Sequence, residues 1–169
     1  MTSGRDRWRP AYVGIGSNLD DPPSQVQEAF AALLELPRSG FARCSPLYRS
    51  APMGPADQPD FVNAVAVVLT LLGPHELLRE LQAIEQARGR RRETPRWGPR
   101  IVDLDLLVMG NIRMEEPGIT IPHPRIAERN FVLFPLADLA PGLLVPGLGS
   151  VQKLLAALGT DGPRIERMV

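Results

Sequence analysis

Hydrophobic and polar residues alternate along the chain in a way that predicts four main strands and two main helices. Strands place successive side chains on opposite faces, and they are expected over 12–16, 41–49, 61–72 and 101–109. Helices repeat their apolar residues every three to four positions, and they are expected over 22–36 and 74–89. The order strand, helix, strand, strand, helix, strand is typical of the split βαβ, ferredoxin-like fold.

This order predicts an α+β fold in which one antiparallel sheet (a βαββαβ core) carries the two helices on one face. The other face is left for loops and ligands. A short strand near 119–121 and additional C-terminal helices near 131–139 and 150–158 are expected after this core. We expect residues 11–169 to form a single domain and residues 1–10 to be a flexible extension. Such a fold hosts many activities, so it indicates no function by itself.

The composition and the net charge mainly exclude classes of protein and partner. The chain has 19 basic and 19 acidic residues, so no overall charge attracts nucleic acid or an anionic membrane. The longest apolar stretch, 64–72, is far shorter than the roughly 20 residues of a membrane-spanning helix. Cys44 is the only cysteine, which excludes an internal disulfide, and a small buried side chain is its expected role. We therefore expect a cytoplasmic monomer that binds neither nucleic acid nor membrane.

The segment 96–106, RWGPRIVDLDL, holds the strongest chemical signal. Its strand is expected to turn four apolar side chains toward the core: Val102, Leu104, Leu106 and Val108. Asp103 and Asp105 then project together from the other face, with Cα atoms about 6.6 to 7 Å apart. Paired carboxylates without thiolates or clustered imidazoles favour Mg²⁺ over Zn²⁺. For an isolated D-x-D pair, two solvated acids on a half-exposed strand are the alternative.

Arginines gather just before this pair: Arg88, Arg90, Arg91, Arg92, Arg96 and Arg100. Guanidinium groups bind phosphate with two hydrogen bonds and neutralise charge on a transferred phosphoryl group. Cations beside two carboxylates therefore indicate a site for a Mg²⁺–polyphosphate complex. The alternatives are a solvated basic loop or an RNA-binding patch, but the aromatic signature of RNA-binding sheets is missing. No P-loop motif occurs, and Gly14-x-Gly16 lacks the remainder of a dinucleotide fingerprint.

Further residues could hold a second, flat ligand. Phe61 and Phe131 could stack on the two faces of a heterocycle while Asn63 reads its edge. Polar candidates occur on one face of the second helix and at a strand exit: Gln82, Glu85 and His123. Ordinary core or surface roles are the alternatives for these residues.

Four segments, taken together, match the pattern of one enzyme family. They are YVGIGSNL (12–19), SPLYRSAPMGPADQPDFVNA (45–64), RWGPRIVDLDLL (96–107) and IPHPRIAERNFVLFPL (121–136). In this order they resemble 6-hydroxymethyl-7,8-dihydropterin pyrophosphokinase, and the resemblance runs over 11–158. It implies transfer of the β,γ-diphosphate of ATP to the hydroxymethyl group of the pterin, with release of AMP, in folate biosynthesis.

The resemblance also implies roles for single residues. Asp103 and Asp105 would hold two Mg²⁺ ions and, with the phosphate-clamping Arg90 and Arg100, would be the catalytic residues. ATP contacts are implied for Leu78, Gln82, Glu85, Arg92, Arg96, Trp97, Leu106, Thr120, His123 and Arg129. The pterin pocket is implied for Gly16, Ser50, Ala51, Pro52, Met53, Phe61, Asn63, Trp97 and Phe131.

Three positions depart from the family pattern. Ser50 stands where threonine is frequent and Phe61 where tyrosine also occurs, and both exchanges are expected to be tolerated. Gly118 stands where some members have an arginine near the adenine or ribose. The alternatives are another two-metal transferase with a ferredoxin-like palm, or an inactive pterin-binding protein. The latter would be expected to have lost an aspartate or a clamp arginine, and neither is lost.

Overall fold

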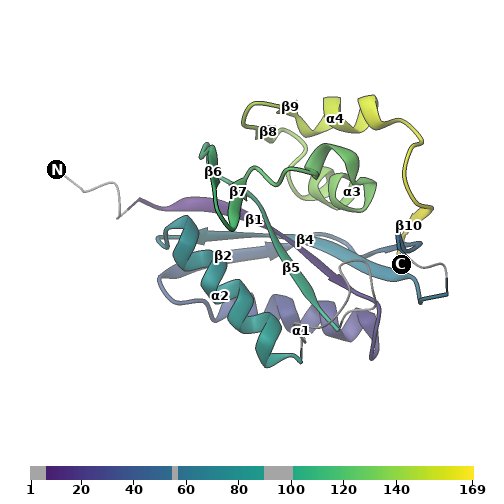
Figure 1. The fold of residues 1–169 in the computed structure, drawn as a ribbon, viewed down its shortest axis with the longest axis horizontal. Coiled ribbons are helices and arrows are strands. Elements are labelled where there is room, and N and C mark those ends of the chain that lie inside the picture. The colour runs from purple at the N-terminus through teal and green to yellow at the C-terminus, as the bar shows by residue number, and fades with distance from the viewer. Residues whose placement is uncertain (1–6, 55–56, 90–100) are drawn as a thin grey trace.

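The structure is a computed structural model that describes residues 7–54, 57–89 and 101–169. Its central antiparallel sheet has the strand order β10-β3-β4-β1-β5, and β2 also pairs with β4. These strands are β1 (Arg9–Ser17), β2 (Ser39–Cys44), β3 (Tyr48–Ser50), β4 (Phe61–Thr70), β5 (Asp103–Met109) and β10 (Ile165–Arg167). Helices α1 (Pro22–Leu34) and α2 (Pro74–Ala87) lie on one face of the sheet, and α3 (Asn130–Leu139) and α4 (Val151–Leu158) lie on the other (Figure 1). The chain is therefore a mixed fold of helices and an antiparallel sheet, as predicted.

The strand predicted over 41–49 is divided in two. Ser45, Pro46 and Leu47 separate β2 from β3, and proline cannot donate a hydrogen bond to a neighbouring strand. Ser45 replaces the lost ladder contacts, because its N–H donates to the carbonyl oxygen of Val65 at 2.9 Å and its Oγ accepts the Val65 N–H at 3.0 Å. As a result β2 and β3 pair one after the other with the same strand, β4.

Several short elements lie outside the main strands and helices. They are the hairpin β6 (Met114–Glu116) and β7 (Ile119–Ile121), the helical turn η1 (Ile126–Glu128), and the pair β8 (Leu144–Val145) and β9 (Gly149–Ser150). Of the short strands only the one at 119–121 was predicted. Strands of two or three residues are too short to show an alternating pattern.

Apolar side chains form two cores, one on each face of the sheet. The first core lies against α1 and α2 and includes Val13, Ile15, Val26, Leu33, Leu77, Leu81, Leu104 and Leu106. The second core lies against α3 and α4 and includes Val65, Leu107, Val108, Val132, Leu133, Leu136 and Val151. The prediction that the second face is left for loops and ligands was therefore wrong for this part of the sheet. The C-terminal helices bring their own apolar faces, which need a partner surface to be buried.

A β-bulge near the end of β5 changes which face its residues occupy. Tyr12 pairs with Val108 and Val13 with Leu106, so Leu107 is an extra residue on β5. Leu107 and Val108 consequently both contribute to the second core, whereas Leu106 contributes to the first. The prediction that Val108 shares a face with Leu106 was wrong, because strict alternation does not hold across a bulge.

The N-terminal end of the sheet extends further than predicted. Strand β1 begins at Arg9, which pairs with Thr70, so it includes two residues of the predicted extension 1–10. Residues 1–6 lie outside the described part of the chain.

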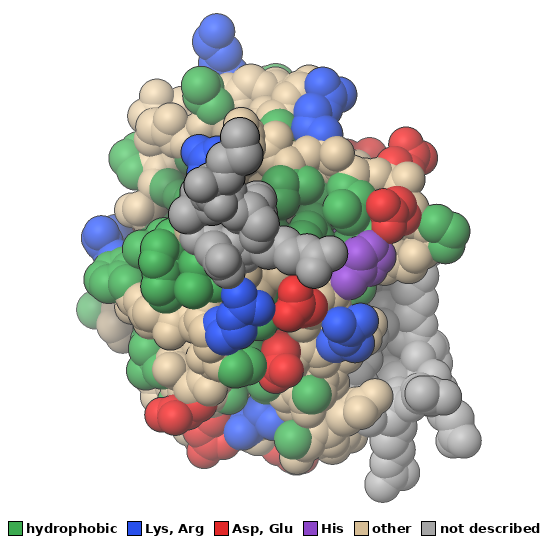
Figure 2. All heavy atoms as spheres, turned by 90° about the vertical axis from the view of Figure 1, so that its left-hand side faces the viewer, with side chains coloured by type: hydrophobic (Ala, Val, Ile, Leu, Met, Phe, Trp, Pro, Cys, Tyr) green, Lys and Arg blue, Asp and Glu red, His purple; other side chains and the backbone are tan. Residues whose placement is uncertain are grey.

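The described surface has no dominant charge on the side drawn in Figure 2, where acidic, basic and apolar side chains are interspersed. Within the described residues, no helix is long and apolar enough to cross a membrane. Cys44 is half-buried in β2, and burial raises the pKa of its thiol to about 11. The thiol is therefore protonated at neutral pH, which agrees with the predicted packing role.

Candidate active site

Two glycines on the central strand β1 leave a hollow in the face of the sheet that α1 and α2 do not cover. Gly14 pairs with Asp105, and Gly16 lies between Asp103 on β5 and Asn63 on β4. Directly paired residues of antiparallel strands share a face, so the aspartates and Asn63 flank a strip without side chains. A Cβ atom at Gly16 would lie 3.1 Å from Oδ1 of Asn63, so a side chain there would intrude on the hollow.

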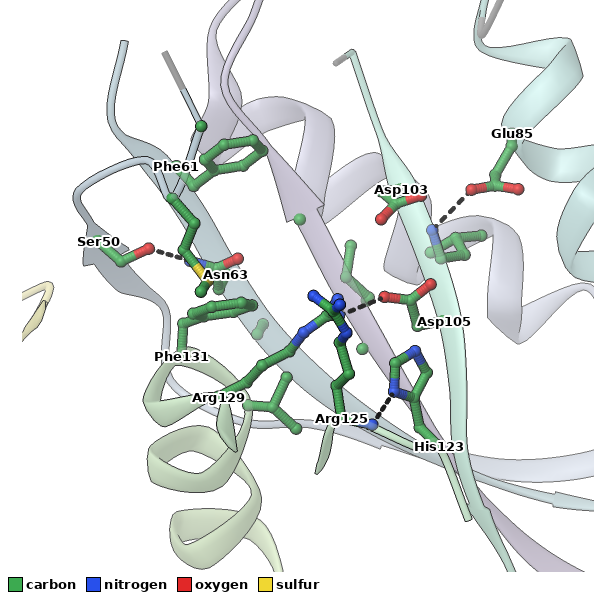
Figure 3. A pocket seen from close by; sticks show the side chains of 18 of the residues that line it. Ser50, Phe61, Asn63, Glu85, Asp103, Asp105, His123, Arg125, Arg129 and Phe131 are labelled. Atoms are coloured by element: carbon green, nitrogen blue, oxygen red, sulfur yellow. Dashed lines mark hydrogen bonds and ion pairs between the residues drawn. The ribbon is translucent and has the colours of Figure 1, made fainter. Parts of the chain in front are cut away.

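The hollow is part of a cavity of about 420 Å³ that collects residues predicted for both ligands (Figure 3). From the predicted pterin set it is lined by Gly16, Ser50, Ala51, Met53, Phe61, Asn63 and Phe131. From the predicted ATP and metal sets it is lined by Leu78, Gln82, Glu85, Asp103, Asp105, His123 and Arg129. Pro52 was also predicted to line the pterin pocket, but it is not part of the wall. Its neighbours Ala51, Met53 and Gly54 are part of the wall.

A second hollow of about 340 Å³ continues from the first beyond β5. Both hollows share Leu78, Asp105 and His123, and the second adds two residues predicted to contact ATP, Leu106 and Thr120. Its rim contains Gly118, which has a φ of 85° and no atom within 4 Å of the position of a Cβ. The rim therefore has no basic side chain at this position.

The end of the cavity nearest β3 is lined by two aromatic rings and a buried amide. The rings of Phe61 from β4 and Phe131 from α3 lie on either side of Asn63 in Figure 3. The Nδ2 atom of Asn63 donates a hydrogen bond of 2.7 Å to Oγ of Ser50, and both polar side chains are buried. This bond fixes the amide between two aromatic faces, an arrangement suited to reading the polar edge of a heterocycle.

The other end of the cavity is charged. Asp103 and Asp105 project into it from β5, and Nη1 of Arg129 lies 3.5 Å from Oδ2 of Asp105. Glu85, which is only 5% exposed, accepts the backbone N–H of Leu104 through Oε2 at 2.9 Å. A carboxylate predicted to contact ATP thus has one oxygen bound to β5, at the residue between the two aspartates.

His123 is held in a defined protonation state beside these charges. Its pKa is lowered to about 4, first by burial and then by the positive charge of Arg129, while Asp103 partly opposes this effect. Nδ1 accepts the backbone N–H of Arg125 at 3.1 Å, which leaves the proton of the neutral ring on Nε2. The ring can therefore donate a hydrogen bond to an anionic ligand without being charged.

We expect NMR to show that His123 is neutral across the physiological range. In a His75→Gln variant, His123 is the only imidazole, and its ring resonance should stay unchanged from about pH 8 to about pH 5. Because the folded pKa lies below the ordinary value of 6.5, its contribution to stability is present above pH 6.5 and is lost as the pH falls through 4. A titration midpoint near 6.5 in the folded protein would contradict this assignment.

The chain matches a family model, that of 7,8-dihydro-6-hydroxymethylpterin-pyrophosphokinase (HPPK), over residues 12–141. The chain belongs to this family. It is 49% identical to the 2-amino-4-hydroxy-6-hydroxymethyldihydropteridine pyrophosphokinase of Pseudomonas aeruginosa over 157 residues, 93% of this chain and 95% of that protein. It is 43% identical to the enzyme of the same name from Haemophilus influenzae over 145 residues, 86% of this chain and 90% of that protein. The resemblance inferred from the motifs is thereby confirmed.

Solved structures of HPPK-DHPS proteins share the fold. A wild-type Plasmodium falciparum HPPK-DHPS has a TM-score of 0.65 at 16% identity, and the match covers 90% of this chain and 42% of that one. HPPK-DHPS in complex with substrates has a TM-score of 0.68 at 14% identity, covering 89% and 43%. This chain spans less than half the length of those proteins, and at such low identity the likeness concerns the fold alone.

Members of the pyrophosphokinase family are kinases, so ATP is the co-substrate. The two aspartates suit the metal that such a nucleotide brings. Mg²⁺ is bound in proteins by one or two carboxylates together with phosphate oxygens and water. Among the described residues, no group of three or more histidine, cysteine, aspartate or glutamate side chains could hold a metal ion. Two carboxylates without a thiolate or a clustered imidazole are ligands that suit Mg²⁺ better than Zn²⁺.

The arginine cluster expected from the sequence is only partly accounted for. The guanidinium of Arg88 contacts Glu28 and Gln25 on α1, so it braces the two helices and does not line the cavity. Its inclusion in a phosphate-binding cluster was wrong, because its sequence position did not reveal the acidic partner. The predicted residues Arg90, Arg92, Arg96, Trp97 and Arg100, together with Arg91, lie outside the described residues.

Sequence reasoning missed several residues of the cavity wall, among them Gly14 and Arg125. Gly14 lies two positions before Gly16 on the same face of β1, and the period of two was the signal that could have identified it. Arg125 lines the cavity two residues after His123, and its backbone orients that ring. Neither its spacing nor its neighbours in the sequence indicate which way an arginine in a loop will point.

Proposed function

We propose that this chain transfers the β,γ-diphosphate of ATP to the hydroxymethyl oxygen of 6-hydroxymethyl-7,8-dihydropterin and releases AMP. One observation carries the proposal: a single cavity joins an aromatic and amide end to a paired-carboxylate end. A flat heterocycle at Phe61 and Phe131 would direct a substituent toward Asp103 and Asp105. Family membership supplies the identity of the heterocycle.

The proposed reaction is an in-line displacement at the β-phosphorus. The hydroxymethyl oxygen forms a bond to this phosphorus, and the bond from phosphorus to the oxygen shared with the α-phosphate breaks. AMP leaves with that oxygen and its electron pair, and the hydroxyl proton is released. Catalysis of such a transfer rests mainly on positioning and on stabilising charge at the phosphoryl oxygens.

The described residues of the cavity wall then have distinct parts in the proposed reaction. Phe61 and Phe131 stack on the pterin, and the pair of Asn63 and Ser50 recognises its polar edge. His123 donates from Nε2 to a phosphate oxygen, and it stays neutral, so it adds no charge that depends on pH near neutrality. Arg129, which already lies beside Asp105, is placed to bind phosphate when the nucleotide enters.

We propose that Asp103 and Asp105 hold the two Mg²⁺ ions predicted from the resemblance. When bound with ATP, Mg²⁺ neutralises negative charge on the phosphates. The cavity wall supports this role, because the carboxylates of Asp103, Asp105 and Glu85 outnumber the described guanidiniums of Arg125 and Arg129. A polyphosphate would be repelled from such a wall unless cations accompanied it.

We further infer that the sheet and its first two helices are the ferredoxin-like core predicted from the sequence. The order β5-β1-β4, followed by the divided strand β2 and β3, supports this topology, as does the position of α1 and α2 on one face. The single-domain organisation and the monomeric state stay predictions. So does the absence of nucleic-acid and membrane partners.

Product analysis tests the reaction directly. The protein is mixed with ATP, magnesium and 6-hydroxymethyl-7,8-dihydropterin, and nucleotides are separated by chromatography. AMP is expected in equal amount to the pterin diphosphate, and none above background when the pterin is omitted. Release of ADP would indicate transfer of a single phosphate and would overturn the proposal. Release of inorganic diphosphate would instead favour the two-metal nucleotidyl transferase considered from the sequence.

A further inference from the structure

The last strand of the chain lies directly behind the aromatic end of the cavity. In β10, Ile165 pairs with Ser50 and Arg167 with Tyr48, which extends the sheet beyond β3. The carbonyl oxygen of Arg164 also accepts the N–H of Ala51 at 2.9 Å. Ser50 and Ala51 form part of the cavity wall, so the backbone of the wall is hydrogen-bonded to the tail of the chain. This tail lies outside the residues matched by the family model, which end at 141.

The tail also contacts the residue that precedes each aromatic ring of the cavity. Asn130, immediately before Phe131, donates from Nδ2 to the carbonyl oxygen of Pro163 at 2.7 Å. Asp60, immediately before Phe61, forms an ion pair of 3.2 Å with Arg164. A segment of two consecutive residues thus connects the two elements that carry the rings, α3 and β4.

The contact at Asn130 is the more restrictive of the two. Asn130 is only 5% exposed, and among the described residues its Oδ1 has no hydrogen-bond partner, so the bond from Nδ2 to Pro163 is the amide's one hydrogen bond within the described part of the chain. Gly162 has a φ of 112°, and a Cβ atom there would lie 2.9 Å from Nδ2 of Asn130. Only glycine allows the tail to approach the amide this closely.

We infer that residues 162–167 form a C-terminal strap that sets the separation of Phe61 and Phe131, with Asn130 as its positioning residue. The strap touches no substrate, and it acts on pterin affinity by holding the two rings and the Ser50 wall in register. This inference rests on the proposed function, since it assigns the strap to the pterin half of that site. The strap contacts described above are at Ser50, Ala51, Asp60 and Asn130, next to the two residues that carry the rings.

Two variants are expected to weaken the hydrogen bond between Asn130 and the carbonyl oxygen of Pro163, one on α3 and one on the strap. Asn130→Ala removes the donor, and Gly162→Ala places a methyl group against the amide. In the full-length protein each is expected to raise KM for 6-hydroxymethyl-7,8-dihydropterin about 5- to 20-fold. KM for ATP and kcat at saturating pterin should stay within about twofold of the wild type, because the nucleotide half is unchanged.

Matched controls separate positioning from loss of stability. Gly159→Ala carries the same type of backbone strain, with a φ of 60°, but no atom lies within 4 Å of its Cβ position. Val26→Ala removes buried apolar volume from the first core, on the opposite face of the sheet. Both are expected to lower the melting temperature and to leave KM for the pterin unchanged.

The outcomes are distinct. The strap is overturned if Asn130→Ala and Gly162→Ala keep the wild-type KM for the pterin, or if KM for ATP and kcat change as much as KM for the pterin. If one variant fails to fold, the other decides. The proposed function is judged on the wild type alone, by its release of AMP. An active wild type with unaffected variants contradicts only the strap, whereas a wild type that does not turn over the pterin overturns both.

Discussion

Asp103→Asn and Asp105→Asn are each expected to lower kcat by about 10³-fold or more while the fold stays intact. Asparagine keeps the shape of the side chain but removes the charge that would hold Mg²⁺ with the phosphates. Little packing is lost, because both carboxylates face the cavity and not the first core. AMP formation at saturating magnesium measures the effect, and thermal unfolding checks the fold.

Comparison of the two variants separates metal binding from an indirect effect. Asp105→Asn also weakens the ion pair with Arg129, whereas that pair remains in Asp103→Asn. If only Asp105→Asn were impaired, the carboxylate would act by holding Arg129, and the metal assignment of Asp103 would be wrong. Glu35→Gln removes one exposed charge at the end of α1 and is expected to behave as the wild type.

Phe61→Ala and Phe131→Ala are each expected to weaken pterin binding by about 1 to 3 kcal/mol, with little change in ATP affinity. Each variant removes one of the two rings between which the heterocycle would lie. Calorimetric titration with the pterin, in the presence of magnesium and a non-hydrolysable ATP analogue, measures the loss. Titration with the analogue alone measures nucleotide affinity.

The appropriate control deletes a similar ring elsewhere. Phe30 on α1 is partly buried against the first core, so Phe30→Ala should cost stability without affecting either ligand. Phe131 also packs against the second core, and its variant is expected to be less stable than that of Phe61. Equal losses of ATP and pterin affinity in both pocket variants would contradict pterin stacking and would indicate that the two rings have a purely structural role.

The central chemistry was accessible from the sequence because it depends on a local rule. Along an uninterrupted strand successive side chains alternate, so the placement of Asp103 and Asp105 opposite Leu104 follows from their spacing alone. The same rule failed at Val108. The bulge at Leu107 leaves Val108 on the same face of the sheet as Leu107, and not on the face of Leu106. A bulge depends on how the strand pairs with its partner, and the sequence of residues 103–109 does not predict it.

Residues far apart in the sequence were harder to place. Arg88 looked like one more cation of a phosphate-binding cluster, but its partner Glu28 lies 60 residues earlier on α1. The strap could not be foreseen, because three residues of β10 carry no periodic signal and Asn130 bonds to Pro163, 33 residues further on. Such contacts cost chain entropy to form and are decided by how the whole chain packs.

By itself, the sequence determined the order of the main strands and helices, the facing of the two aspartates and the family to which the chain belongs. Each of these is written in short stretches, as a period of two, a period near 3.6 or a run of motif residues. Only the tertiary structure decided that α3, with α4 packed against it, covers part of the second face, that Gly14 and Gly16 open the hollow, and that the tail reaches the pterin end. These features depend on which surfaces pack together. Burial of apolar area stabilises such packing however far apart the residues are in the sequence.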